Sequence, residues 1–154
     1  GIHCEVVPGV TSALAASAEL KTSLTCRGVS RNVTFVTPRA GAGEIAGDWV
    51  KSVCAADTSV MYMAAGQAAA IAGELIARGL PADTPVVIVE NASLPEAAQT
   101  AMTLNELQHA NERMTHGGPA LLMIGRVFQR HVDARTRAID AATATQVAVS
   151  ALCA

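Results

Sequence analysis

Residues 64–90 read AAGQAAAIAGELIARGLPADTPVVIVE, and this stretch decides the fold class. Its first part has the alanine-rich, apolar spacing of a helix over 64–78, and Gly79 stands where helices commonly end. Pro81 opens a turn. Residues 86–90 then form an unbroken apolar run, typical of a strand that is buried on both faces of a sheet. A helix that leads directly into such a strand predicts an α/β domain.

The same alternation extends to both sides of this stretch. Thr11 and Ser12 have the hydroxyl side chains that favour the start of a helix. Residues 21–31 and the glycine-rich stretch 38–47 show no periodicity and are predicted to be loops. The remaining predicted elements are strands over 3–7, 32–37, 58–63, 99–103 and 120–124, and helices over 10–20, 48–55 and 104–114.

The chain has 154 residues, about the size of one ordinary domain. The composition changes near residue 130, where Ala, Thr and Arg dominate and no large apolar face remains. We therefore expect one domain over 1–128 and a tail over 129–154, which is either disordered or a peripheral helix. The sequence begins without Met and directly at a predicted strand, so we expect it to start in mid-protein.

Composition excludes several classes of protein. Hydrophobic residues make up 51% and charged residues 16%, so the chain has enough apolar surface to fold. The net charge of −2 gives no basic footprint for nucleic acid, and no apolar run of about 18 residues predicts a membrane span. The cysteines are scattered, which favours reduced thiols and a cytoplasmic protein. The sequence also lacks a nucleophile-elbow motif, a phosphate-binding loop and histidines at metal-ligand spacing.

Five segments stand where α/β proteins bind ligands, at strand ends and at the start of a helix. Taken alone, each is also compatible with ordinary capping, solvation or core packing. They are Val7-Pro8-Gly9-Val10-Thr11-Ser12-Ala13, Leu24-Thr25-Cys26-Arg27, Tyr62-Met63-Ala64, Pro85-Val86-Val87-Ile88-Val89-Glu90-Asn91-Ala92 and Pro119-Ala120-Leu121-Leu122-Met123-Ile124-Gly125-Arg126-Val127.

In this order and spacing the five segments resemble the carboxyl-terminal half of the tetrapyrrole methyltransferases. The likeness covers residues 1–128 and is greatest to the branch that methylates uroporphyrinogen III, either free-standing or as the methylating module of siroheme synthases. The motifs of that family's amino-terminal half are absent from the sequence. The resemblance implies a three-layer α/β/α domain with a mixed sheet of about five strands.

The resemblance also implies an activity and a set of contacts. The family transfers methyl groups from S-adenosyl-L-methionine to uroporphyrinogen III, which gives precorrin-2 for siroheme and cobalamin, and it forms homodimers without a metal. The cofactor lies in a trough between two α/β domains. By position, Thr11, Ser12, Met63, Ala92 and Ala120 would contact the cofactor. Arg27, and less directly Arg39, would face the carboxylates of the substrate.

The sequence departs from the family pattern in loops on the substrate side. Ser23 replaces a proline, Cys26 replaces a histidine, and Thr37-Pro38-Arg39 replaces Thr-Gly-His. These departures leave open a methyltransferase for another corrin precursor. The absent amino-terminal motifs leave open a non-catalytic domain that only contacts the cofactor and dimerises. No catalytic side chain can be identified from the sequence.

Overall fold

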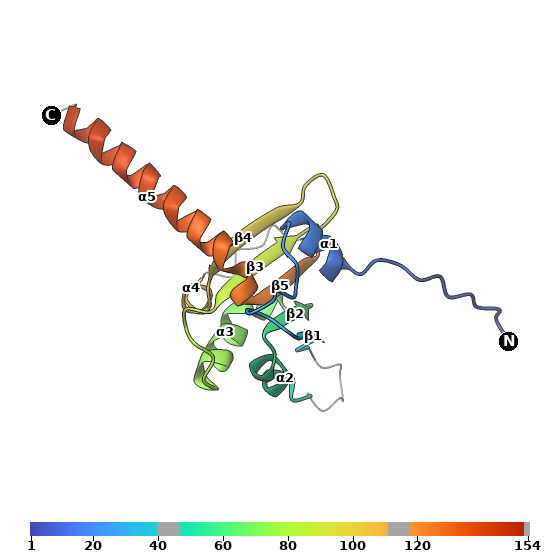
Figure 1. Ribbon diagram of the computed structural model, residues 1–154. Helices are drawn as coiled ribbons and strands as arrows, with labels where there is room; N and C mark the ends of the chain where they lie inside the picture. The colour runs from blue at the N-terminus through green and yellow to red at the C-terminus, as the bar shows by residue number, and fades with distance from the viewer. Residues whose placement is uncertain (40–46, 111–117, 153–154) are drawn as a thin grey trace.

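The computed structural model describes residues 1–39, 47–110 and 118–152, and it contains a mixed five-stranded sheet in the order β1-β2-β5-β3-β4 (Figure 1). The strands are β1 (Val33–Val36), β2 (Thr58–Tyr62), β3 (Pro85–Glu90), β4 (Ala98–Thr103) and β5 (Ala120–Gly125). β1 and β2 are parallel, whereas β5 is antiparallel to both of its neighbours, β2 and β3. The mixed α/β sheet of the prediction is confirmed.

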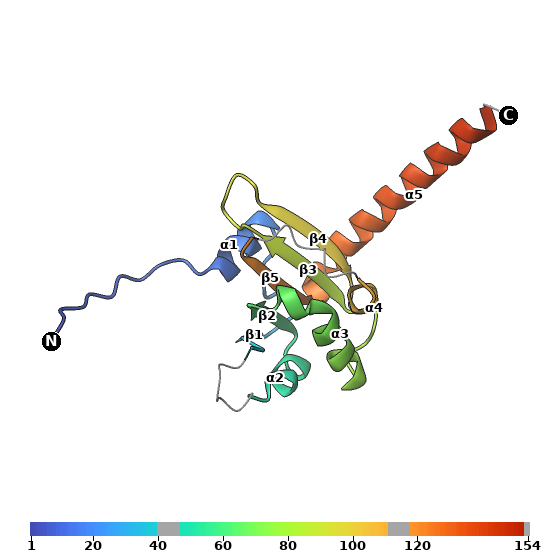
Figure 2. The same ribbon diagram turned by 180° about the vertical axis from the view of Figure 1, so that it is seen from behind.

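Helices cover both faces of the sheet, as the two opposite views show (Figures 1 and 2). One face packs against α2 (Trp49–Ala55), α3 (Ala68–Ala77) and α4 (Leu104–Gln108). The other packs against α1 (Ser12–Glu19) and Phe128, which precedes α5 (Gln129–Leu152). Short 3-10 helices cover Ala65–Gln67 and Arg126–Phe128.

The central strand β5 shows why both layers are needed. Leu122 and Ile124 point into the core under α2, α3 and α4, whereas Leu121 and Met123 point into the core under α1. Side chains of a strand alternate between the two faces, so an unbroken apolar run requires cover on both. β3 follows the same rule, since all six of its residues are buried.

Side-chain caps fix the start of three helices, and the one at Thr11 confirms the prediction for the start of α1. Thr11 accepts a hydrogen bond from the Ala13 backbone N–H at the start of α1, and Asp48 does the same for Lys51 at the start of α2. Thr103 and Glu106 form a reciprocal capping box at the start of α4. That helix ends at Gln108, earlier than predicted; its predicted last residues, and most of the predicted loop 38–47, lie outside the described residues.

The strand predicted over 3–7 is wrong. Residues 1–10 form no secondary structure, and they extend away from the body with Ile2 99% exposed (Figure 1). A strand is stabilised by pairing with a neighbour, and the two edges of the sheet, β1 and β4, do not pair with this segment.

The segment after residue 128, for which the sequence left two possibilities open, forms the helix α5. Val132 in its first turns is buried, and the helix then runs out from the body (Figure 1).

Candidate functional site

One edge of the sheet collects the ends of several elements. β1, β2 and β3 run in the same direction, so their carboxyl ends meet there, and the antiparallel β5 begins there. The start of α1 lies at the same edge, because the Thr11 side chain contacts Tyr62 at the end of β2. Ligands of open α/β sheets bind at the carboxyl ends of strands.

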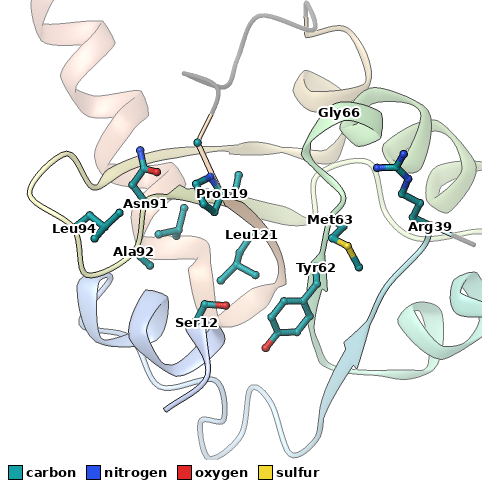
Figure 3. Close-up of a pocket in the computed structure, with 13 residues that line it drawn as sticks. Ser12, Arg39, Tyr62, Met63, Gly66, Asn91, Ala92, Leu94, Pro119 and Leu121 are labelled. Atoms are coloured by element: carbon teal, nitrogen blue, oxygen red, sulfur yellow. The ribbon is translucent and has the colours of Figure 1, made fainter. Parts of the chain in front are cut away.

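A cavity of about 460 Å³ lies at this edge, within the range of small-molecule sites (Figure 3). Its walls come from the start of α1, the segment after β1, the end of β2, the loop after β3 and the entry to β5. The lining residues are Ser12, Arg39, Tyr62, Met63, Gly66, Val89, Asn91, Ala92, Leu94, Gly118, Pro119, Ala120 and Leu121.

The backbone of this cavity is unusual at two strand ends. Met63 follows β2 with φ 54°, and Asn91 follows β3 with φ 50°, both in the left-handed region that side chains other than glycine seldom adopt. For methionine this conformation is especially uncommon. Residues in such a conformation persist only where the surrounding structure holds them in place, and they are concentrated at active sites and ligand-binding sites. Here the turn brings the Met63 side chain, 64% exposed, to the cavity.

A tight contact closes the wall between β3 and β5. The Asn91 backbone N–H donates a 2.9 Å hydrogen bond to the Pro119 carbonyl, and the Asn91 side chain lies directly over Gly118. A Cβ atom at Gly118 would lie 2.7 Å from Asn91 Cγ, closer than real contacts allow. Position 118 therefore requires glycine as long as Asn91 keeps its place.

The predicted contacts separate into two groups. Ser12, Met63, Ala92 and Ala120 all line the cavity, and so does Arg39. Thr11 is not among the lining residues. Its hydroxyl lies 2.5 Å from the hydroxyl of Tyr62, which does line the cavity. Arg27 is also outside the lining, in the exposed turn closed by Cys26 and Ser30.

Tyr62, Asn91, Gly118 and Leu94 line the cavity but were not predicted from the sequence as site residues. Tyr62 and Asn91 directly precede the predicted site residues Met63 and Ala92 within the motif segments, so their sequence positions pointed toward the site. Their roles depend on contacts between elements that are distant in sequence, which a motif does not reveal. Leu94 carries no sequence signal, because it lies in the loop between β3 and β4.

The electrostatics of the site favour binding over proton transfer. Arg39 is the one charged side chain among the described lining residues, and none of these is Asp, Glu or His. The groups with shifted pKa values lie elsewhere; for example, a hydrogen bond from Arg126 lowers the pKa of Asp83. In the described ranges no cluster of His, Cys, Asp and Glu is arranged to hold a metal ion. The cavity suits a largely apolar ligand that carries an anionic group toward Arg39.

None of the helices in the described part of the chain combines the length and apolar character needed to cross a bilayer.

Comparison with known proteins agrees with this architecture. Residues 1–108 match the family model of the tetrapyrrole (corrin/porphyrin) methylases. A uroporphyrinogen-III C-methyltransferase of Paracoccus denitrificans is 37% identical over 128 residues, which cover 82% of this chain and 45% of that protein. Siroheme synthase 1 of Klebsiella pneumoniae is 34% identical over 131 residues, 85% of this chain and 27% of that protein. The chain thus spans half or less of the length of these relatives.

A solved structure gives the same result in three dimensions. Uroporphyrin-III C-methyltransferase from Thermus thermophilus, in complex with S-adenosyl homocysteine, superposes with a TM-score of 0.69 at 31% identity. The match covers 81% of this chain and 53% of that one.

Proposed function

Because the chain belongs to the tetrapyrrole (corrin/porphyrin) methylase family, we propose that it forms the carboxyl-terminal half of an S-adenosyl-L-methionine-dependent uroporphyrinogen-III C-methyltransferase. One observation carries the proposal: a single cavity gathers residues from four of the five motif segments, at the edge where α/β sheets bind ligands. The proposed product is precorrin-2, formed by two methyl transfers.

The cofactor contacts follow from the cavity walls. Met63 offers a soft, polarisable side chain to the flat adenosyl group. Ala92 and Ala120 are small, so the ligand can approach the backbone at the end of β3 and the start of β5. Ser12 contributes from the start of α1, where backbone N–H groups favour negative charge.

The substrate contacts are arginines. Uroporphyrinogen III carries several carboxylates, and a guanidinium binds a carboxylate through two parallel hydrogen bonds. We assign Arg39 to this role from within the cavity. Arg27 keeps its predicted role toward the substrate only from outside the cavity, given its place in the exposed turn.

The chemistry requires positioning above all. A reduced pyrrole carbon is already nucleophilic, and the sulfonium of the cofactor is a strong methyl donor. Holding carbon, methyl group and sulfur in line supplies roughly 7–11 kcal/mol of the barrier. The walls described above orient the donor, and the described lining contains no acid or base. Proton removal from the macrocycle is therefore assigned to groups outside that lining, and we propose that the amino-terminal half of the enzyme supplies them.

The proposed unit spans residues 1–128, works as a cytoplasmic homodimer and carries α5 as an appendage. A narrower role, a domain that contacts the cofactor without catalysis, is supported by the lack of an acid or base among the described lining residues.

The first experiment is calorimetric titration with S-adenosyl homocysteine. The chain is tested alone and then with the amino-terminal half of the Paracoccus relative added as a separate chain. Met63 is 64% exposed, so a bound ligand can bury up to about two thirds of its side chain. Because complete burial of a methionine side chain stabilises by about 1.5–3 kcal/mol, this contact contributes up to about 1–2 kcal/mol to binding. Met63→Ala should therefore weaken binding roughly five- to thirtyfold.

Ile139→Ala on α5 is the matched control, because Ile139 is 50% exposed and lies outside the cavity lining. It should bind like the wild type. No binding in either format, or equal losses in the two variants, would contradict the assignment. Methyl transfer to uroporphyrinogen III only in the two-chain mixture would support the full activity, and binding without turnover in that mixture would support the narrower role.

A further inference from the structure

We propose that Tyr62 is a positioning residue, whose hydroxyl group holds the start of α1 against the cofactor cavity through Thr11. This inference deepens the proposed function and rests on it, since the ligand concerned is S-adenosyl-L-methionine or its demethylated product. It also gives Thr11 a different role from the direct cofactor contact that its motif implies.

The hydroxyl group of Thr11 is already engaged. It lies 2.5 Å from the Tyr62 hydroxyl and accepts a 3.4 Å hydrogen bond from the Ala13 backbone N–H. A hydroxyl has one donor and two acceptor positions, so these two contacts use most of its capacity. Thr11 is also absent from the cavity lining, whereas the next residue, Ser12, is part of it.

Tyr62 connects the elements that build the cavity. Its backbone pairs with Leu121 of β5, and its ring lies 6.4 Å from the Phe35 ring of β1, centroid to centroid. Its hydroxyl reaches α1, and its ring faces the cavity (Figure 3). Met63, the proposed adenosyl contact, follows directly in the left-handed backbone conformation.

The bond fixes the distance between two walls of the cavity, the start of α1 and the end of β2. α1 is a short helix of eight residues, held to the body by buried Ala13 and Ala16. The far end of α1 is fixed by buried Leu20 and by a hydrogen bond from the Ser93 backbone N–H to the Glu19 carboxylate. At the start of the helix, next to the cavity, only small alanine side chains are buried, so a directional bond is needed there to fix its position. The bond between Tyr62 and Thr11 provides that direction, and it keeps Ser12 opposite Met63 across the ligand.

Four variants test the pair: Tyr62→Phe, Thr11→Val, the double variant and Thr11→Ser. Tyr62→Phe removes only the hydroxyl and keeps both the ring contact with Phe35 and the cap of α1. Thr11→Ser keeps a hydroxyl for both contacts and serves as the rescue variant. Thr143→Val is the matched control, because Thr143 is exposed on α5 and lies outside this cavity and outside the motif segments.

Affinity for S-adenosyl homocysteine is measured in the format in which the wild type binds. Losing the shared hydrogen bond should weaken binding roughly threefold to tenfold in Tyr62→Phe, and at least as much in Thr11→Val, which also loses the cap of α1. The double variant should bind no more weakly than the weaker single variant, since both remove the same interaction. Thr11→Ser and Thr143→Val should bind like the wild type, and Tyr62→Phe should keep the melting temperature of the wild type.

Tyr62 is the single tyrosine of the sequence, so its Raman doublet reports the hydrogen bond directly. The doublet ratio should change in Thr11→Val and stay unchanged in Thr11→Ser and Thr143→Val. Wild-type affinity in Tyr62→Phe, or additive losses in the double variant, would overturn the positioning role while leaving the proposed function intact. Failure of the wild type itself to bind would instead overturn the proposed function, and with it the role that rests on it.

Discussion

Gly118→Ala gives a direct test of how the cavity wall between β3 and β5 is built. The added methyl group would lie 2.7 Å from both Cγ and Nδ2 of Asn91 and would meet its Oδ1 as well. Asn91 cannot retreat as a whole, since its backbone N–H is bonded to Pro119 and its φ is already 50°. Its side chain must therefore rotate out of its present position.

The size of the effect follows from these contacts. Forcing a methyl group into a filled site costs about 1–3 kcal/mol. For a chain of this length each kcal/mol lowers the melting temperature by about 2–4 °C, so Gly118→Ala should melt about 2–12 °C below the wild type. Asn91 and Gly118 both line the cavity, so affinity for S-adenosyl homocysteine should fall as well.

The assay is thermal unfolding followed by circular dichroism, with ligand titration of the same samples. Gly66→Ala is the control, because Gly66 also lines the cavity but nothing lies within 4 Å of its added Cβ. It should melt at or slightly above the wild-type temperature. Asn91→Gly accepts a positive φ and removes the obstructing side chain, so adding Gly118→Ala to it should cost nothing further. Unchanged stability in Gly118→Ala, or an equal penalty in the Asn91→Gly background, would refute this reasoning.

Two pH-dependent predictions concern α5 and its neighbours. Burial alone would raise the pKa of Glu106, but hydrogen bonds from Thr103 and Arg135 outweigh it and lower the pKa. Glu106→Gln should therefore lose roughly 0.5–1 kcal/mol of stability at pH 7, measured by urea unfolding. The difference should shrink as the pH falls below the ordinary glutamate pKa and vanish once it has passed through the lower folded-state pKa. Burial, and then the charge of Arg130, lower the pKa of His131. The unfolded chain therefore takes up this proton at a higher pH than the folded chain does, so the free energy of unfolding should decrease as the pH drops below about 6.5. This decrease should be absent in His131→Gln, and an equal decrease there would assign it to another group.

The elements that were predicted correctly are those whose signals are local. The apolar run at 86–90 needs no partner to be identified as a buried strand, and Thr11 and Asp48 mark helix starts through their own side chains. The strand order could not be predicted. β5 is the last strand in sequence but lies between β2 and β3, and this order depends on pairing across many residues.

The incorrect prediction of a strand at 3–7 has the same cause, because it too depended on pairing with a distant segment. Its β-branched and apolar residues favour an extended backbone, and residues 1–10 form no helix. Extended backbone becomes a strand only where an edge accepts its hydrogen bonds, and neither β1 nor β4 accepts this segment. Val6 and Val7 consequently stay exposed, although their sequence pattern is that of a buried strand.

The residues of the candidate site also divide into those with a local sequence signal and those whose role depends on contacts between distant elements. Met63, Ala92 and Ala120 could be selected from the sequence because each stands at the end or start of a strand within a motif. Tyr62 and Asn91, one position before Met63 and Ala92, could not, because their importance comes from Thr11 and Gly118 on other elements. We propose that Met63, Ala92 and Ala120 offer surface to the ligand, whereas Tyr62 and Asn91 hold the walls of the cavity in place. Met63→Ala should therefore change affinity alone, whereas Gly118→Ala, which forces a methyl group into a filled site, should change affinity and stability together.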